Sequence, residues 1–412
     1  MQTGMEHRIA KAKIRIMDRG GQAVPAGMPV RFELQNHEFL FGCGAFDAVP
    51  ACMKKAPEGA PPAAFFRDRM NKWLRVFNYG TLPFYWGRFE PEEGKPHTEE
   101  LMRAAGYLQE RGVTVKGHPL CWHTACANWL LKYDDKTIMD KQLERIHRDV
   151  SAFRGVIDVW DVINETVIMP EFDRYDNAIT RICRAYGRVN LIREVFLAAK
   201  AANPEGLFLI NDFNLSGQYR DVIAECLDAG VPIGAIGLQS HQHQGYRGEA
   251  YFRTVLDRFA PLGLPLHFTE NTLVSGHLMP PEIVDLNDYQ IPEWPTTPEG
   301  EKRQAEEWEE MLRLLFGHPA VEAVTGWDFA DGAWLGAPSG MIRKDGSEKP
   351  AYWKLKELIH QIWHTDETLL TDADGYVTLK GFRGTYRVSC AGGTGFFRLR
   401  EGGGTPECMI GR

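Results

Sequence analysis

Two glutamates in this 412-residue chain stand where a buried segment ends. Glu165 follows the largely apolar run Val156–Val162, with Asn164 beside it, and Glu270 closes the run that starts at Leu266. Burying a charged group costs free energy, so carboxylates at such positions need a reason. Cleavage of a glycosidic bond needs one protonated and one ionised carboxyl group facing the same cleft. Glu165 and Glu270 are therefore the candidates for catalysis.

Polar and aromatic side chains also follow the other apolar runs of the chain. Sugars bind to flat apolar rings that stand beside amides and imidazoles, because these groups match the two faces and the hydroxyls of the sugar. We therefore expect a carbohydrate partner, a β-linked glycan or glycoside. The candidate substrate-binding residues are Tyr85, His118, Trp122, His123, Asn164, Asn211, Gln239, His241, Trp327 and Trp334.

These residues can meet only if the apolar runs lie side by side. Eight runs alternate with amphipathic stretches, which predicts an α/β fold of the (β/α)8 TIM barrel type, with the active site at the carboxyl ends of its strands. The expected strands are Phe39–Phe46, Val76–Phe84, Thr114–His123, Val156–Glu165, Leu207–Asn214, Ala235–His241, Leu266–Asn271 and Val324–Ala330. The expected helices are Glu99–Arg111, Lys136–Ala152, Ala178–Ala202, Gly217–Ala229, Glu249–Phe259, Glu299–Phe316 and Tyr352–Ile362.

The two ends of the chain do not fit the barrel, which we place at residues 37–364. Residues 7–36 and 365–412 contain short runs separated by glycine-rich turns, which predict β-strands. Neither flank is long enough to bury a good core alone. We predict one small accessory β domain built from both flanks; the alternative is that each flank packs on the barrel separately. The proline-rich stretch Pro280–Gly300 is expected to contribute to a substrate wall.

Charge and composition disfavour several kinds of partner. A net charge of −8 argues against nucleic acid and offers no polybasic membrane anchor. The sequence contains no run of 18 apolar residues, so we expect no membrane span. The N-terminus lacks the apolar region of a secretory signal. We expect a cytoplasmic protein, or a secreted or periplasmic one if a signal has been removed. We expect free cysteines, no cofactor, no metal and no obligate protein partner.

The motifs around the candidate residues resemble those of glycoside hydrolase family 10, the family of endo-β-1,4-xylanases. GHPLCWH, WDVINE, LINDFN, GLQSH, FTEN and EKPAYWKL are similar to motifs of that family and occur in its order, between about Phe39 and Ile362. The resemblance implies a retaining glycosidase with Glu165 as acid/base and Glu270 as nucleophile. It also implies a carboxyl separation of about 5–5.5 Å and a covalent glycosyl-enzyme intermediate.

The same resemblance implies roles for the neighbours of the two glutamates. Asn164 would hold the 2-hydroxyl of the sugar, and His241 would hydrogen-bond to the nucleophile. His118 and Gln239 would line the subsite of the sugar under attack. The apolar wall of that subsite would be formed by Trp327 and Trp334.

The chain departs from the family after the second strand. Family xylanases have a Glu, an Asn and a Lys there, which bind hydroxyls of the xylose on the non-reducing side. Unless a local gap shifts the alignment, this chain has Thr81, Leu82 and Tyr85 instead, with Phe84 beside them. We therefore expect xylanase-like chemistry with altered glycone subsites. The alternative is a β-glycosidase of the same fold that acts on a non-xylan β-glycoside.

A second departure follows the nucleophile. The family usually has an Asp two residues later, where it orients the histidine that corresponds to His241. Here that position is Thr272, whose hydroxyl is a weaker orienting group. We expect His241 to be less basic, or to use His243 or another partner.

Two rival hypotheses remain at this stage. A metal-dependent barrel hydrolase could use four histidines as ligands, although the His-x-His pair stands at the sixth strand and no Lys or Asp completes the site. A glycan-binding protein without activity is disfavoured by the presence of both glutamates. The sequence does not distinguish endo from exo action. The four histidines are His118, His123, His241 and His243.

Overall fold

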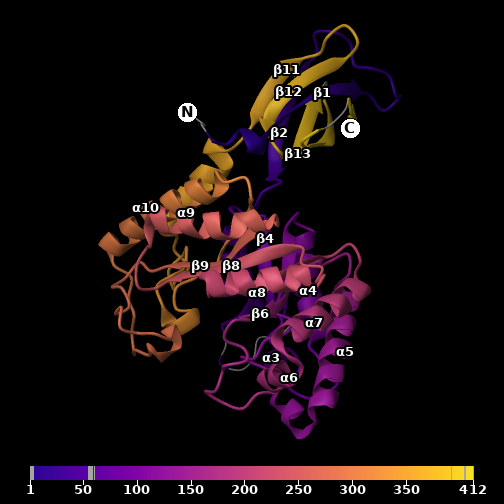
Figure 1. The fold of residues 1–412 in the computed structure, drawn as a ribbon. Helices are drawn as coiled ribbons and strands as arrows, with labels where there is room; N and C mark the ends of the chain where they lie inside the picture. Colours follow the sequence, from indigo (N-terminus) through magenta and orange to yellow (C-terminus); the bar gives the residue numbers. More distant parts are fainter. Residues whose placement is uncertain (1–3, 54–58, 60, 391, 403–404, 412) are drawn as a thin grey trace.

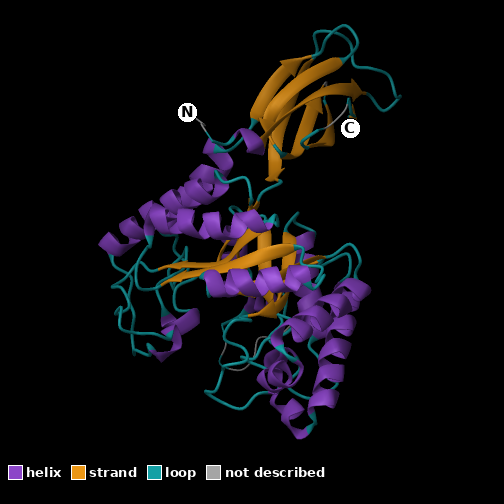
Figure 2. Ribbon diagram, in the orientation of Figure 1, coloured by secondary structure: helices purple, strands orange, loops and turns teal. Residues whose placement is uncertain are grey.

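The computed structural model describes residues 4–411 except 54–58, 60, 391 and 403–404. Eight parallel strands close a barrel in the order β10-β3-β4-β5-β6-β7-β8-β9, with helices outside it (Figures 1 and 2). The predicted (β/α)8 barrel is confirmed. Its strands are β3 (Leu40–Gly44), β4 (Tyr79–Pro83), β5 (Thr114–His118), β6 (Val159–Asn164), β7 (Leu207–Asp212), β8 (Ala235–Gln242), β9 (Leu266–Leu273) and β10 (Val321–Gly326).

The helices follow the predicted amphipathic stretches, with three differences. The expected helix Ala178–Ala202 is two helices, because Gly187 between them has a φ of +85°. The helices α1 (Ala48–Ala51), α2 (Ala63–Trp73) and α3 (Trp86–Phe89) were not expected, and the last expected helix ends in a π-helical turn, Leu358–Ile362. The other helices are α4 (Thr98–Gln109), α5 (Asp135–Phe153), α6 (Ala178–Tyr186), α7 (Arg188–Ala202), α8 (Gly217–Asp228), α9 (Gly248–Phe259), α10 (Pro298–Phe316) and α11 (Pro350–Glu357).

Short 3-10 helices lie in the loops at Glu6–Arg8, Asn128–Lys132, Ala260–Leu262, Leu286–Asp288 and Trp334–Gly336. Within the part of the chain that the structure describes, no helix combines the length and the apolar character that a membrane crossing requires.

Several strands end earlier than expected, and this matters for the site. β5 ends at His118 because Pro119 follows, and a proline has no N–H to continue the ladder. Trp122 and His123 therefore belong to a loop rather than to the strand. That loop lies against the neighbouring strand, because the Cys121 N–H donates to the carbonyl of Val162.

The two flanks pair with each other in two further sheets. The strand β1 (Ile9–Met17) lies between two C-terminal strands in the order β12-β1-β15. The strand β2 (Pro29–His37) lies inside the second sheet, in the order β11-β2-β13-β14. The flanks therefore form these sheets together, while the boundaries at 7–36, 37–364 and 365–412 stay a prediction. The C-terminal strands are β11 (Asp366–Leu370), β12 (Tyr376–Phe382), β13 (Gly384–Cys390), β14 (Gly393–Leu399) and β15 (Glu407–Met409).

The accessory sheets lie at the amino ends of the barrel strands, near both chain termini (Figure 1). Asn78, which precedes β4, donates to Asn36 and to the carbonyl of Phe39 just before β3. The buried Arg8 donates to the carbonyls of Phe316 and His318, each at 2.9 Å, ahead of β10. The carboxyl ends of the strands, where the candidate residues lie, are at the opposite end of the barrel.

We predict that Arg8→Ala lowers the free energy of unfolding by about 2–4 kcal/mol, because it leaves buried carbonyl groups without their charged donor. Denaturant unfolding followed by tryptophan fluorescence measures the change. Lys11→Ala on the exposed face of β1 is the matched control and should change stability by less than about 0.5 kcal/mol. Equal effects of the two variants would contradict the anchoring role of Arg8.

Candidate active site

Glu165 leaves its strand in a strained backbone conformation. Its φ is +57°, which is uncommon for a residue other than glycine and costs of order 1 kcal/mol or more. A hydrogen bond to the neighbouring strand β7 holds this conformation, because the Glu165 N–H donates to the carbonyl of Asn211 at 2.8 Å. The turn places the Glu165 carboxyl group 3.8 Å from Nε2 of His123.

A chain of side-chain amides joins Glu270 to Glu165. Asn211 Nδ2 donates to Glu270 Oε1 and to Asn164 Oδ1, each at 2.8 Å. Asn164 Nδ2 lies 3.4 Å from Glu165 Oε1, and Gln239 Nε2 donates to Asn164 Oδ1 at 2.9 Å. Four adjacent strands, β6 to β9, each contribute to this network, which explains why so many polar residues stand at strand ends.

The surroundings of Glu270 favour its ionised form. Its Oε2 lies 3.3 Å from His241 Nε2, and its Oε1 lies 3.8 Å from His118 Nδ1. Burial alone would raise the pKa of Glu270, but the imidazoles of His118 and His241 outweigh burial and hold that pKa below its ordinary value. Glu270 is therefore a carboxylate at neutral pH.

The surroundings of Glu165 favour its protonated form. Burial raises the pKa of Glu165 to about 8, and repulsion from Asp212 and Glu270 adds to the shift. At neutral pH one carboxyl group is therefore protonated and the other ionised. Carboxyl groups whose pKa values are pushed apart in this way can divide the work of an acid and a nucleophile or base.

The hydroxyl of Thr272 stands where it can orient His241. Thr272 Oγ1 lies 3.4 Å from His241 Nδ1 and 3.3 Å from His243 Nδ1, and it accepts from the Gln242 N–H at 3.2 Å. A hydroxyl has one donor and two acceptor positions, which balance if His243 donates to Thr272 and Thr272 donates to His241. His241 then keeps its proton on Nε2, which faces Glu270.

Aromatic rings form walls on both sides of the two glutamates. Trp327 lies 5.2 Å from His118 and 6.2 Å from His241, and Trp334 lies 4.5 Å from His241 between ring centroids. Tyr85 lies 5.7 Å from His118 and 5.7 Å from Trp122. Together with the polar network, these contacts bring all twelve residues that the sequence analysis singled out into one region at the strand ends.

The residues at the departure from the family divide between core and site. Thr81 and Leu82 are buried in β4, and Phe84 packs against Phe153 and Trp160 in the core. Tyr85 is only half-buried and faces His118. Of these four residues, Tyr85 is the one that the structure places at the catalytic region.

Sequence reasoning missed several residues of the site. The buried Lys116 ammonium lies 2.6 Å from Asp161 Oδ2, and His118 Nδ1 lies 2.7 Å from the same oxygen. Charged residues inside two otherwise apolar strands were the signal that could have revealed this layer. Phe172, whose ring lies 4.4 Å from that of His123, comes from a loop and carried no such signal.

The charge distribution fits a hydrogen-bonded network rather than a metal centre. Among the described residues, only His118, Asp161 and Glu270 are close enough together to hold an ion, so the four histidines considered above do not form a ligand cluster. Asp161 Oδ2 is already bound by Lys116 and His118. An ammonium at that position repels a second cation.

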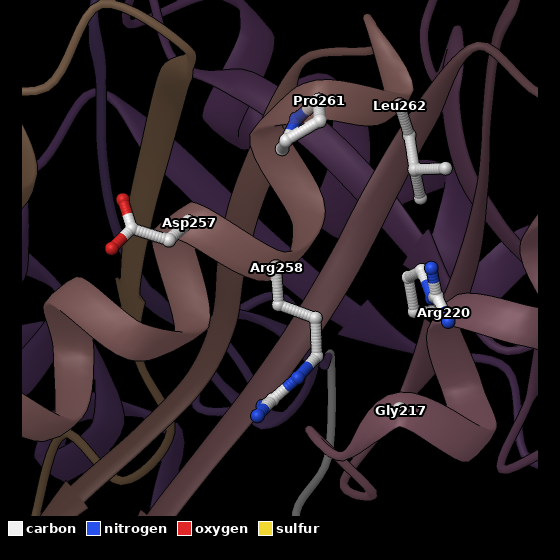
Figure 3. Close-up of a pocket in the computed structure, with 6 residues that line it drawn as sticks. All are labelled: Gly217, Arg220, Asp257, Arg258, Pro261 and Leu262. Carbon is white, nitrogen blue, oxygen red and sulfur yellow. The ribbon is translucent and has the colours of Figure 1, made fainter.

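A separate hollow of about 290 Å³ lies on the outer surface, where α8 meets the end of α9 (Figure 3). It contains a single carboxyl group and none of the candidate residues, so it cannot supply a pair of carboxyl groups. Its lining residues are Gly217, Arg220, Asp257, Arg258, Pro261 and Leu262.

The comparisons with known proteins decide the family. The model of glycosyl hydrolase family 10 matches residues 84–358. The chain belongs to glycosyl hydrolase family 10. It is therefore a glycoside hydrolase. Among curated relatives of this family 10 chain, endo-1,4-beta-xylanase B of Thermotoga neapolitana is 27% identical over 295 residues, which cover 67% of this chain and 78% of the relative.

Another relative, endo-1,4-beta-xylanase of Geobacillus stearothermophilus, is 27% identical over 65% of this chain and 83% of its own length. Other matched xylanases are longer, and the match spans 39% and 41% of two of them. A solved family 10 structure from Paenibacillus barcinonensis shares the fold with a TM-score of 0.63 and 23% identity. The matched region covers 78% of this chain and 95% of the Paenibacillus barcinonensis chain.

We predict that Thr272→Val lowers kcat/KM on 4-nitrophenyl β-xylobioside about tenfold, since one neutral hydrogen bond that fixes the proton of His241 is lost. Thr325→Val is the matched control, because the Thr325 hydroxyl is buried without a hydrogen-bond partner. The control should stay within about twofold of the wild type. A control that loses as much activity as Thr272→Val would contradict the orienting role.

Proposed function

We propose that this enzyme hydrolyses β-glycosidic bonds with retention of configuration, with Glu165 as acid/base and Glu270 as nucleophile. The observation that supports the proposal is the opposite pKa shift of two carboxyl groups joined by one amide chain. The two-step mechanism requires two carboxyl groups held in one cleft, of which one is protonated and the other ionised. A carboxyl separation of about 5–5.5 Å belongs to the same mechanism.

In the first step a carboxylate oxygen of Glu270 attacks the anomeric carbon of the sugar. The bond from that carbon to the glycosidic oxygen breaks, and Glu165 gives its proton to the departing oxygen. In the second step Glu165, now ionised, removes a proton from water, and the water oxygen displaces Glu270 from the anomeric carbon. Each glutamate thereby returns to its starting protonation state.

The hydrogen bonds around Asn164 support its role in holding the 2-hydroxyl of the sugar. Its Oδ1 is occupied by Asn211 and Gln239, which leaves Nδ2 to face Glu165 and the substrate. The amide orientation is therefore fixed before a sugar arrives, and a group fixed in advance loses less entropy on binding. We infer that this donor is available to the sugar under attack.

The substrate class that we propose is xylanase-like, with altered glycone subsites on the β4 side of the site. The curated relatives are named endo-1,4-beta-xylanases. Tyr85 supplies a ring beside His118 where family xylanases have a lysine, and a ring cannot replace the hydrogen bonds of an ammonium to sugar hydroxyls. The same observation supports the second candidate, a β-glycosidase acting on a non-xylan β-glycoside.

We predict that kcat/KM on a 4-nitrophenyl β-glycoside falls as pH rises above about 8. The first step needs a protonated Glu165, and Glu165 loses its proton above its pKa of about 8. The acid limb should lie below pH 4.5, the ordinary value for a glutamate, because the pKa of Glu270 is lowered. Initial rates between pH 3 and pH 10 measure both limbs.

The variants Glu165→Ala and Glu270→Gln are the controls for this profile. Glu165→Ala should lose the alkaline limb on the 4-nitrophenyl glycoside, and it should keep more of the wild-type rate on a 2,4-dinitrophenyl glycoside, whose leaving group needs no proton. Glu270→Gln should lose at least about a thousandfold in kcat on every substrate. An unchanged alkaline limb in Glu165→Ala would contradict the assignment of the acid.

A panel of glycans tests the substrate class. We expect hydrolysis of plain linear β-1,4-xylan to be about tenfold slower than that of the best substrate, since a lost hydrogen bond to a sugar hydroxyl has about that effect. The panel compares linear xylan, arabinoxylan, mixed-linkage β-glucan and aryl β-glycosides through reducing-sugar release. Comparable rates on linear xylan and on the best other substrate would refute the altered glycone preference.

A further inference from the structure

Two long loops meet at one side of the candidate active site. One loop, residues 165–177, follows β6, and the other, residues 274–297, follows β9. Arg174 of the first loop binds Asp288 of the second with two hydrogen bonds, Nη1 to Oδ1 at 2.8 Å and Nη2 to Oδ2 at 3.0 Å. Its Nη2 also lies 3.2 Å from Asp285 Oδ2. A two-pronged arginine–carboxylate pair fixes orientation as well as distance.

The loop that follows β9 reaches this contact from across two strands of the barrel. In the barrel, β7 and β8 lie between β6 and β9. Gln244, which follows β8, donates to the carbonyls of Pro280 and Ile283 at 2.9 and 2.8 Å. The Met279 N–H donates to the carbonyl of His243 at 2.9 Å. The loop therefore runs from β9 past β8 and encloses the sector above β7 and β8.

The enclosing contact connects to both catalytic glutamates through packed rings. On the β6 side, the ring of Phe172 lies 4.4 Å from that of His123, whose Nε2 is 3.8 Å from Glu165. On the β9 side, Tyr289 lies 5.0 Å from Trp294.

Trp294 in turn lies 5.9 Å from His243. His243 shares the Thr272 hydroxyl with His241, which faces Glu270. The pair between Arg174 and Asp288 thus links the two series of contacts, one of which starts at Glu165 and the other at Glu270.

The position of this enclosure determines which part of a substrate it meets. Under the proposed function, on which this inference rests, the sugar under attack lies toward Tyr85, His118 and Trp327, at the carboxyl ends of β4, β5 and β10. The leaving group then lies over β7 and β8. An internal linkage can be cut only if the chain continues past the site on both sides, and an enclosed sector shortens the space on one side.

We propose that the bridge from Arg174 to Asp285 and Asp288 limits the size of the leaving group to a small aglycone or one or two sugar units. The enzyme then acts on short glycosides and near the reducing ends of chains rather than at internal linkages. The side chains of Arg174 and Asp288 are 48% and 56% exposed. An exposed ion pair contributes little to global stability, so it can be removed without unfolding the barrel.

The experiment compares Arg174→Ala with the wild type on substrates whose leaving groups differ in length. The probes are 4-nitrophenyl β-xylobioside and β-1,4-xylo-oligosaccharides of three to six units with an ¹⁸O label at the reducing end, so that mass spectrometry locates each cut. Arg253→Ala is the matched control, since Arg253 is an exposed arginine paired with Glu249 on α9.

We expect Arg174→Ala and wild type to cleave the aryl glycoside within about twofold of each other. The kcat/KM of Arg174→Ala divided by that of the wild type should rise with leaving-group length, to about tenfold for leaving groups of three or more sugars. Arg253→Ala should give a ratio near one throughout. The double variant Arg174→Asp with Asp288→Arg should return the ratio toward one for long leaving groups, because it rebuilds the pair with the charges exchanged.

A ratio that does not change with leaving-group length would overturn the inference, and this includes the case in which neither protein cleaves any oligosaccharide. A wild type that cleaves the aryl glycoside but cuts long oligosaccharides at internal linkages would also overturn it while leaving the proposed function intact. A wild type that hydrolyses no aryl β-glycoside would overturn the proposed function and this inference together.

Discussion

The two candidate catalytic glutamates are joined by neutral amides, and the rest of the site depends on that connection. Two carboxyl groups in one cleft repel each other, so their ionisation is coupled. Asn211 and Asn164 fix the positions of Glu270 and Glu165 without adding charge. The surroundings then decide which group carries the proton. Imidazoles stand around Glu270, whereas burial and neighbouring carboxylates act on Glu165.

The barrel supplies this arrangement because the ends of adjacent parallel strands meet at one rim. Asn164, Asn211, Gln239 and Glu270 come from four consecutive strands and need no long loop to reach each other. Beneath them, the buried Lys116–Asp161 pair orients His118. The accessory sheets lie at the opposite end of the strands, where Arg8 fastens them to the barrel. Their contacts therefore concern stability rather than the geometry of the rim.

Much of the site could be predicted because its residues belong to regular strands. Period and spacing predicted that Glu165 and Glu270 stand at strand ends, and the barrel fold then implied that they meet. Glu165 does follow β6, whereas β9 continues past Glu270 to Leu273. The break at Gly187 was missed because both halves of that segment are amphipathic, and only a positive φ separates them. The contact of Arg174 with Asp288 could not be predicted, since it joins two loops 114 residues apart whose paths depend on tertiary packing.

The division of work between Glu165 and Glu270 requires that their pKa values be far apart. Carbon-13 NMR titration of protein labelled at the glutamate carboxyl carbon measures both pKa values, with Glu165→Gln and Glu270→Gln to assign the two resonances. The account predicts that the Glu165 resonance titrates near pH 8 and that the Glu270 resonance titrates below 4.5. Midpoints between about 4 and 5 for both resonances, the range of unperturbed glutamates, would contradict it.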